Sequence, residues 1–243
     1  MPRGFWRKVV SVRKMARGLV VLFSLLSVGL FCHSNSEEVT KCIDGPYHKD
    51  KPSPEGPDYV ECHSWREKSC CTANFTAELQ RNRVEVLYNF SWNHCKNLSQ
   101  ECEKFIKNQE CFWSCEPNLI KWHVGEGVLK MVPICAKYCD EWFDACKSDY
   151  TCVQDWLRGF NYTNSIYSCP TNSPCRTFQE FYKNGEGLCN TMWAQSFYYE
   201  KSDNCMVMEF SPGKNPNDAV TASAPRFSTF IHPVLMFALL KIF

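Results

Sequence analysis

The sequence predicts a single α+β domain of mainly short helices and loops, with few short strands and a framework of disulfides. Of its 17 cysteines, Cys32 lies near the N-terminus and 16 lie between Cys42 and Cys205. An even number at about one residue in ten is typical of small secreted domains, in which disulfides compensate for a limited core. Helical periodicity is confined to short stretches, and strand patterns are scarce. We therefore expect eight disulfides.

The expected elements follow in chain order. Residues 48–58 are rich in proline and charge and predict an extended loop, and a short strand is expected around residues 85–90. Apolar residues recur at helical spacing over residues 102–113. The clearest helix is expected over residues 133–146, where three cysteines and an aromatic face share one side. Residues 187–197 are a third, shorter helix candidate.

Both ends of the chain carry targeting patterns. Basic residues precede an apolar run at 19–28 and predict a secretory signal peptide over residues 1–34, with Met15 as an alternative start. Near the other end, small residues around Ser223 precede a short spacer and an apolar tail, which is the order of a glycolipid attachment signal. The sequence thus predicts a cysteine-rich domain over 35–216 and an anchor signal over 217–243 that attaches the chain to the membrane at Ser223. Plain secretion is the alternative.

Charge and motifs exclude several classes of function. The formal charge of +1 includes six basic leader residues without an acidic partner, so the rest of the chain carries −5 and has no footprint for nucleic acid. The sequence lacks a Gly-rich phosphate loop, a G-x-S-x-G elbow and an H-E-x-x-H motif, so we expect no enzyme, no catalytic residue and no cofactor. A zinc site built from paired cysteines needs reduced thiolates, which an oxidising secretory route disfavours, so no metal is expected.

Four N-x-S/T sequons predict surface glycans on a secreted chain. Their asparagines are Asn74, Asn89, Asn97 and Asn161.

Two large rings stand side by side in the segment ECFWSC. Phe112 and Trp113 lie about 100° apart if this segment is helical. We expect Phe112 to pack in the core and Trp113 to form one wall of a ligand cavity. Core packing is the alternative for any single ring, because cysteine-rich domains pack rings against sulfur. Segments that combine rings with polar groups fit a pocket better, since pockets are mostly apolar with a few placed polar groups.

The chain resembles the folate receptor and riboflavin-binding protein family over residues 42–205. The motifs that carry the resemblance are HKDKPSPE, ECHSWREKSCCTANFT, YNFSWNHC, CEKFIKNQECFWSCEPNL, VPICAKYCDEWFDACKSDYTCVQDWLRGFNYT and LCNTMWAQSF. The resemblance implies a deep aromatic cleft for a flat heterocyclic vitamin, bound as a ligand. It also implies the pairs Cys42–Cys70, Cys62–Cys111, Cys71–Cys115, Cys95–Cys175, Cys102–Cys146, Cys135–Cys205, Cys139–Cys189 and Cys152–Cys169.

The same resemblance implies a set of ligand-binding residues. Trp113 and Trp193 would cover the two faces of the vitamin ring. The sides and polar edges would be contacted by Tyr88, Trp92, Gln109, Glu110, Trp156, Arg158, Phe160, Tyr162 and Ser196.

The choice of vitamin depends on two departures from the folate receptor pattern. Those receptors place a carboxylate where this chain has Gln109, and the shorter loop IKWHVGEGVLKM has no counterpart of their Trp-Arg-x-x-Arg segment. Riboflavin is therefore favoured over folate. The competing hypothesis is a cell-surface adhesion protein on the same scaffold, resembling an egg-surface sperm receptor, with a protein partner in place of a vitamin.

Overall fold

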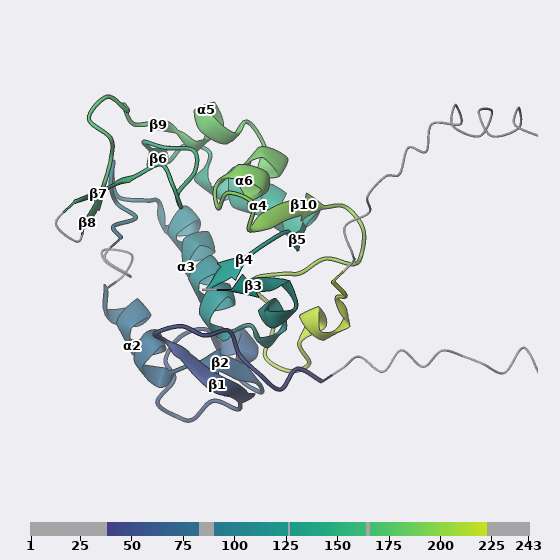
Figure 1. Cartoon of the computed structure of the whole chain (residues 1–243). Helices are drawn as coiled ribbons and strands as arrows, with labels where there is room; N and C mark the ends of the chain where they lie inside the picture. Colours follow the sequence, from purple (N-terminus) through teal and green to yellow (C-terminus); the bar gives the residue numbers. More distant parts are fainter. Residues whose placement is uncertain (1–37, 83–89, 126, 164–165, 223–243) are drawn as a thin grey trace, which may run out of the picture. The chain divides into compact units, whose positions relative to one another are not determined.

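Figure 1 shows the computed structural model, which describes residues 38–82, 90–125, 127–163 and 166–222. Eight disulfides join these residues, and they are the same eight pairs that the resemblance implies. The paired cysteines are from 17 to 80 residues apart in sequence. Links of this length restrict the unfolded chain strongly, so they stabilise a fold whose regular elements are short.

The helices are short, except for one that crosses the centre of Figure 1. This helix, α3, spans Gln100–Cys115, and its N-cap is Ser99, whose side chain accepts a hydrogen bond from the backbone N–H of Cys102. The other helices are α2 (Ala73–Asn82), α4 (Ala136–Cys146), α5 (Phe178–Tyr182) and α6 (Gly185–Thr191), with 3-10 turns η1 (His63–Trp65), η2 (Pro117–Trp122) and η3 (Pro216–Ala219).

The strands form five separate two-stranded sheets among the described residues. Four pairs are antiparallel: β1 (His48–Ser53) with β2 (Ser69–Cys71), β3 (His123–Gly125) with β4 (Val128–Leu129), β6 (Tyr150–Thr151) with β9 (Arg176–Thr177), and β7 (Asn161–Thr163) with β8 (Ile166–Ser168). β5 (Val132–Cys135) and β10 (Phe197–Glu200) pair in parallel, with Phe197 opposite Val132. The predicted α+β class is confirmed.

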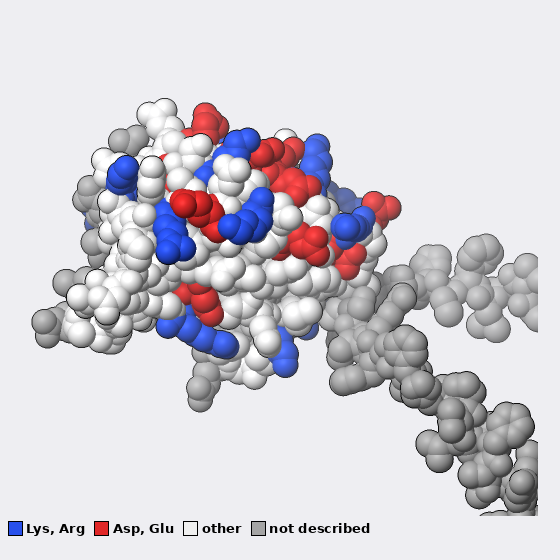
Figure 2. Space-filling model, turned by 90° about the horizontal axis from the view of Figure 1, so that it is seen from above, with Lys and Arg blue, Asp and Glu red and all other residues white. Residues whose placement is uncertain are grey.

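Charges of both signs share the surface. On the face shown in Figure 2, Lys and Arg side chains are interspersed with Asp and Glu side chains. Exposed ion pairs of the described residues include Lys104 with Glu209 at 3.0 Å and Lys147 with Asp144 at 3.1 Å. Exposed pairs of this kind contribute only about 0–1 kcal/mol each, so they do not explain the stability of the fold.

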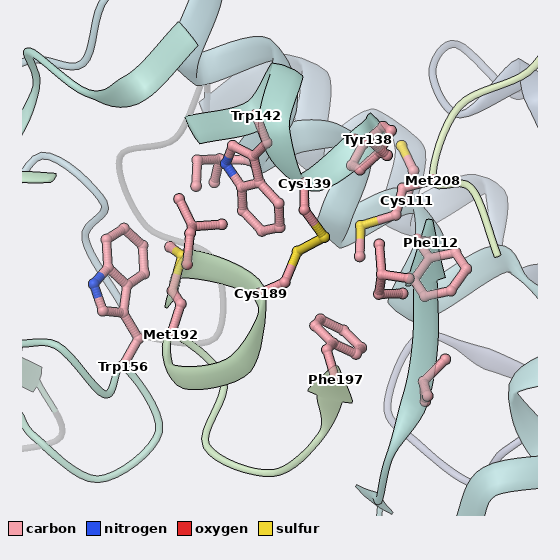
Figure 3. Close-up of a cluster of buried hydrophobic side chains, with 14 of the residues drawn as sticks. Cys111, Phe112, Tyr138, Cys139, Trp142, Trp156, Cys189, Met192, Phe197 and Met208 are labelled. Atoms are coloured by element: carbon pink, nitrogen blue, oxygen red, sulfur yellow. A yellow bond between two sulfur atoms is a disulfide. The ribbon is translucent and has the colours of Figure 1, made fainter. Parts of the chain in front are cut away.

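The core contains both disulfides and aromatic rings. Figure 3 shows the disulfide Cys139–Cys189 between α4 and α6, with the rings of Trp142, Phe197 and Phe112 around it. These three rings are fully buried or nearly so. The core therefore combines covalent links with ring packing, as expected for a cysteine-rich domain.

The helix predictions differ in outcome. The helix over residues 102–113 is confirmed within α3. The helix over 133–146 is confirmed from Ala136 onward, because the residues before it extend as β5. The third prediction is wrong at its end: α6 stops at Thr191, the chain turns at Ala194 with φ of +53°, and Phe197 begins β10.

The predicted extended loop is wrong in its first half. His48–Ser53 form strand β1, which accommodates Pro52 because β1 has a neighbour on one side only. Of the strand expected around residues 85–90, only Phe90 is among the described residues, and the predicted signal peptide over 1–34 and Ser223 lie outside them. Within the described part of the chain, no helix has both the length and the apolar character needed to cross a membrane.

Candidate ligand-binding cavity

A cavity of about 680 Å³ opens between α3, β1, β4 and the turn that joins α6 to β10. This volume lies within the range of about 300–1,000 Å³ that is usual for small-molecule sites. The lining residues are Asp44, Gly45, Pro46, His48, Phe90, Trp92, Gln109, Glu110, Trp113, Gly127, Val128, Leu129, Trp156, Leu157, Tyr167, Trp193, Ser196 and Phe197.

The structure brings together most, but not all, of the residues expected to bind ligand. The lining includes Trp92, Gln109, Glu110, Trp113, Trp156, Trp193 and Ser196. Arg158 and Tyr162 are exposed and lie outside the lining. Phe160 packs behind it, with ring centroids 4.9 Å from Phe90 and 6.2 Å from Trp156. Tyr88 lies outside the described residues.

Helix α3 contributes both a ring and polar groups to the cavity. Trp113 is half-buried and lines it, while Gln109 and Glu110, four and three residues earlier, lie on the same side of the helix. Phe112 is fully buried and faces Trp65 and Phe197 instead, with centroid distances of 6.4 and 6.1 Å. The prediction that Phe112 belongs to the core is confirmed.

The end of α3 is held by covalent and polar contacts. Cys111 and Cys115 are bonded to Cys62 and Cys71. His48 on β1 packs edge-on against the Trp113 ring at 5.8 Å, and its Nε2 lies 3.2 Å from the backbone oxygen of Trp113. Because a carbonyl oxygen only accepts, Nε2 donates this bond and Nδ1 is left as an acceptor. These contacts restrain the Trp113 wall before any ligand arrives.

Two further tryptophans come from the C-terminal half of the chain. The Nε1 of Trp156 donates to Thr151 Oγ1 at 3.1 Å, and its backbone N–H donates to the oxygen of Met192 at 2.8 Å. The Trp156 ring meets Trp193 edge-on, with centroids 5.9 Å apart. This contact couples the segment after β6 to the segment after α6, so the two rings are positioned together.

Four lining residues carry a buried polar atom that has no hydrogen-bond partner among the described residues. These atoms are Nδ1 of His48, Oε1 of Gln109, Oε2 of Glu110 and Nε1 of Trp193. A buried polar group without a partner costs about 1–3 kcal/mol, so native proteins rarely leave several in one place. Their concentration around one cavity indicates that a ligand with both donors and acceptors completes their bonding.

Two features set the electrostatics of the cavity: burial, and the lack of basic side chains among the described lining residues. Burial raises the pKa of Glu110 from 4.5 to about 8, so this carboxyl is mostly protonated near neutral pH. Burial also lowers the pKa of His48, which keeps the imidazole neutral. Asp44 is the remaining charged group, and neither Lys nor Arg occurs among the described lining residues. The cavity therefore suits an uncharged ligand better than an anion.

The resemblance implied lining positions at Leu157 and Phe197, which the structure places in the lining, but no sequence pattern indicated His48, Phe90 or Leu129. His48 and Leu129 belong to short strands that reach the cavity only through pairing with β2 and β3. No local periodicity marks such residues. The HKDKPSPE motif was the only signal that could have indicated His48.

Groups of possible metal ligands among the described residues do not form a metal site. Both contain cysteines that are bonded in disulfides, such as Cys95 and Cys152, so they offer no free thiolate.

A disulfide-linked fold around an aromatic cavity with unpartnered polar atoms defines a small-molecule-binding protein. The family model of the folate receptor family matches residues 41–208, and the chain belongs to this family of binding proteins, which are not enzymes. It is 34% identical over 190 residues to folate receptor gamma of Homo sapiens, covering 74% of this chain and 77% of the relative. It is 36% identical over 200 residues to the riboflavin-binding protein of Dromaius novaehollandiae, covering 81% and 80%. Folate receptor alpha of Homo sapiens is 32% identical over 198 residues, with 77% of each chain covered.

Proposed function

We propose that the chain is an extracellular vitamin-binding protein that holds a flat heterocycle in the described cavity, and that its vitamin is riboflavin in preference to folate. The observation that carries the proposal is the presence of Trp113, Trp193 and four unpartnered buried polar atoms around one cavity. Relatives named for folate and for riboflavin at similar identity support a vitamin as the class of ligand.

Cavity charge favours riboflavin over folate. Folate carries two carboxylates at neutral pH, whereas riboflavin is uncharged. The described lining contains Asp44 and Glu110 but no Lys or Arg to neutralise an anion. Gln109 also stands where folate receptors place the carboxylate that binds the pterin ring, so the charge-assisted bond of those receptors has no counterpart at this position.

In this proposal Trp113 and Trp193 stack on the faces of the ring, Trp92 and Trp156 close its sides, and Gln109 and Ser196 contact its polar edges. Burying about 200 Å² of ring at ~25 cal/mol/Å² contributes roughly 5 kcal/mol. Nanomolar affinity requires about 12 kcal/mol, before the cost of association is met. The polar contacts must therefore contribute a large share and decide which vitamin binds. Arg158, Tyr162 and Phe160 have no contact role in the proposal, because they do not line the cavity.

The test is a titration of the secreted domain, residues 35–222, with riboflavin, following the quenching of flavin fluorescence. Folic acid is titrated in parallel and followed by tryptophan emission. We expect strong quenching by riboflavin at equimolar protein and a much weaker response to folic acid. Binding of folic acid alone would replace riboflavin by folate in the proposal, and silence with both would overturn it.

We further propose that the chain is exported and held on the outer face of the plasma membrane by a glycolipid attached at Ser223. Eight disulfides support an oxidising route of export. The sequon residues Asn74, Asn97 and Asn161 are exposed, as glycan sites require, and Asn89 lies outside the described residues.

Treatment of expressing cells with a phosphatidylinositol-specific phospholipase should release the protein into the medium. Protein found in the medium without treatment would indicate plain secretion.

A further inference from the structure

We propose that Gln109 and Glu110 together recognise an imide edge of the bound heterocycle, an N–H between two carbonyl groups, and that Glu110 takes part as a hydrogen-bond donor. The inference rests on the proposed function and deepens it, because it names the chemical feature of the vitamin that the cavity selects.

The positions of Gln109 and Glu110 on α3 support this inference. Gln109 and Glu110 are 4% and 5% exposed, and both line the cavity. Oε1 of Gln109 and Oε2 of Glu110 are buried without hydrogen-bond partners among the described residues. Both residues lie one helical turn before Trp113 on α3, so a ring stacked on Trp113 has its edge within the reach of these two side chains. Two adjacent polar groups thus face the same edge of the ligand.

The second support is the protonation state of Glu110. Burial raises its pKa to about 8, and no charged neighbour contributes to this shift. The other titratable groups of the described lining are Asp44, which precedes β1, His48 on β1, and the phenol of Tyr167 on β8. Lys107, on the preceding turn of α3, is paired with Glu61 at 3.7 Å. Near neutral pH the Glu110 side chain is therefore mostly a carboxylic acid, which has an O–H to donate, and not a carboxylate.

The hydrogen-bonding groups of Gln109 and Glu110 must match those on the edge of the heterocycle that they contact. Oε1 of Gln109 accepts a bond from a ring N–H, and the O–H of Glu110 donates to a carbonyl beside that N–H. The isoalloxazine ring of riboflavin has this edge, with N3–H between two carbonyl groups. The edge of a pterin presents an amino group and N3–H as adjacent donors, and it needs two acceptors, which a carboxylate supplies. A protonated Glu110 therefore favours the imide, and its ionisation removes that preference.

The experiment measures riboflavin affinity from pH 6 to pH 9 for the wild-type secreted domain, for Glu110→Gln and for Glu101→Gln. Glu101 is exposed in the first turn of α3 and serves as the matched control. For the wild type and the control we expect a constant Kd below about pH 8 and a rise approaching tenfold per pH unit above it, because binding requires the proton. The amide introduced by Glu110→Gln also donates to a carbonyl and does not ionise, so the Kd of this variant should stay nearly flat over the whole range.

A second arm uses riboflavin methylated at N3, which keeps the ring but loses the N–H. We expect the wild type to bind it at least tenfold more weakly than riboflavin. Equal affinity for the two flavins, a flat pH profile of the wild type, or loss of binding by a folded Glu110→Gln variant would each overturn the inference while leaving the proposed function intact. If the wild type bound neither riboflavin nor folic acid at any pH, both the inference and the proposed function would be overturned; binding of folic acid alone would overturn the inference and replace riboflavin by folate in the proposed function.

Discussion

Phe112 and Trp113 are neighbours in the chain but have different surroundings. Phe112 is fully buried against Trp65 and Phe197, whereas Trp113 is half-buried and lines the cavity. One residue along a helix turns the side chain by about 100°, which is enough to separate the core from the cavity. The two rings therefore allow stability and ligand binding to be tested separately.

Trp113→Ala should abolish the quenching of riboflavin fluorescence while changing the free energy of unfolding little. Phe112→Ala should instead lower that free energy by about 3–5 kcal/mol, because it leaves a cavity in the core. Flavin titration and denaturant unfolding of both variants provide the measurements. Normal riboflavin binding by a folded Trp113→Ala protein would remove Trp113 from the proposed site.

Glu110 should make the stability of the ligand-free protein depend on pH. Its folded-state pKa of about 8 lies above the ordinary value of 4.5, so the folded state keeps a proton that the unfolded state releases. The associated stability is complete below about pH 4.5 and is lost as the pH rises to about 8, with a slope of at most ~1.4 kcal/mol per pH unit.

The check is the difference in unfolding free energy between the wild type and Glu110→Gln at about pH 5, 6.5 and 8, which spans the range between the two pKa values. The amide does not ionise, so the variant should gain on the wild type as the pH rises, and Glu101→Gln should not. A difference that stays constant with pH would contradict the buried, protonated state of Glu110.

At the scale of elements, Glu116 ties three short 3-10 turns together. It is 2% exposed, and its carboxylate accepts from Trp65 Nε1 at 2.7 Å, from the backbone N–H of Asn118 at 2.8 Å and from Asn217 Nδ2 at 2.7 Å. Asn215 Nδ2 donates to it as well, at 3.0 Å. These partners lie on or beside η1, η2 and η3, so one carboxylate holds the C-terminal segment against the rest of the domain. The folded part continues to Val220, which is 4% exposed.

Glu116→Ala should detach this C-terminal segment. Each buried donor that loses its partner costs about 1–3 kcal/mol, so the variant should lose at least about 2 kcal/mol of unfolding free energy. Limited proteolysis should then cut within residues 211–221, where the wild type resists. Glu209→Ala is the control, since it removes only exposed contacts such as the pair with Lys104 and should cost less than about 1 kcal/mol. Equal resistance of the wild type and Glu116→Ala to the protease would contradict this role.

The turn between α6 and β10 forms one wall of the cavity, and the elements on both sides of it hold it in place. The pair β5–β10 and the disulfide Cys139–Cys189 connect α4 and α6 to the centre of the fold. Trp193 and Ser196 lie in the turn between α6 and β10, so they are held at both ends. A wall built from a turn is stable here because both flanking elements are fixed.

At the scale of the whole molecule, we expect the charge of the cavity to distinguish an uncharged flavin from one that carries a phosphate. The described lining has acidic groups and neither Lys nor Arg, so these residues offer no cation to a phosphate on the ligand. We expect riboflavin to raise the unfolding free energy by about 2.7 kcal/mol at a hundredfold excess over its Kd. Riboflavin 5′-phosphate at the same concentration should give a clearly smaller shift. Thermal unfolding with each flavin measures this, and an equal shift with both would show that the phosphate lies outside the influence of the cavity charge.

Much of this protein was predictable from the sequence alone. The cysteine count indicated eight disulfides, periodicity located α3 and most of α4, and the one-residue offset of Phe112 and Trp113 separated a core ring from a cavity ring. Family motifs implied the disulfide pairs and several lining residues. These features depend on local spacing and on residue identity, which the chain carries without reference to its fold.

The tertiary structure alone decided which residues meet in the cavity and how their charges behave. His48 and Leu129 join the lining through strand pairing, whereas Arg158 and Tyr162 remain outside it although they are close to Trp156 in sequence. The raised pKa of Glu110 likewise depends on burial. Contacts between distant segments determine both the shape of a cavity and the loss of water around a carboxyl group, and no local pattern in the sequence records them.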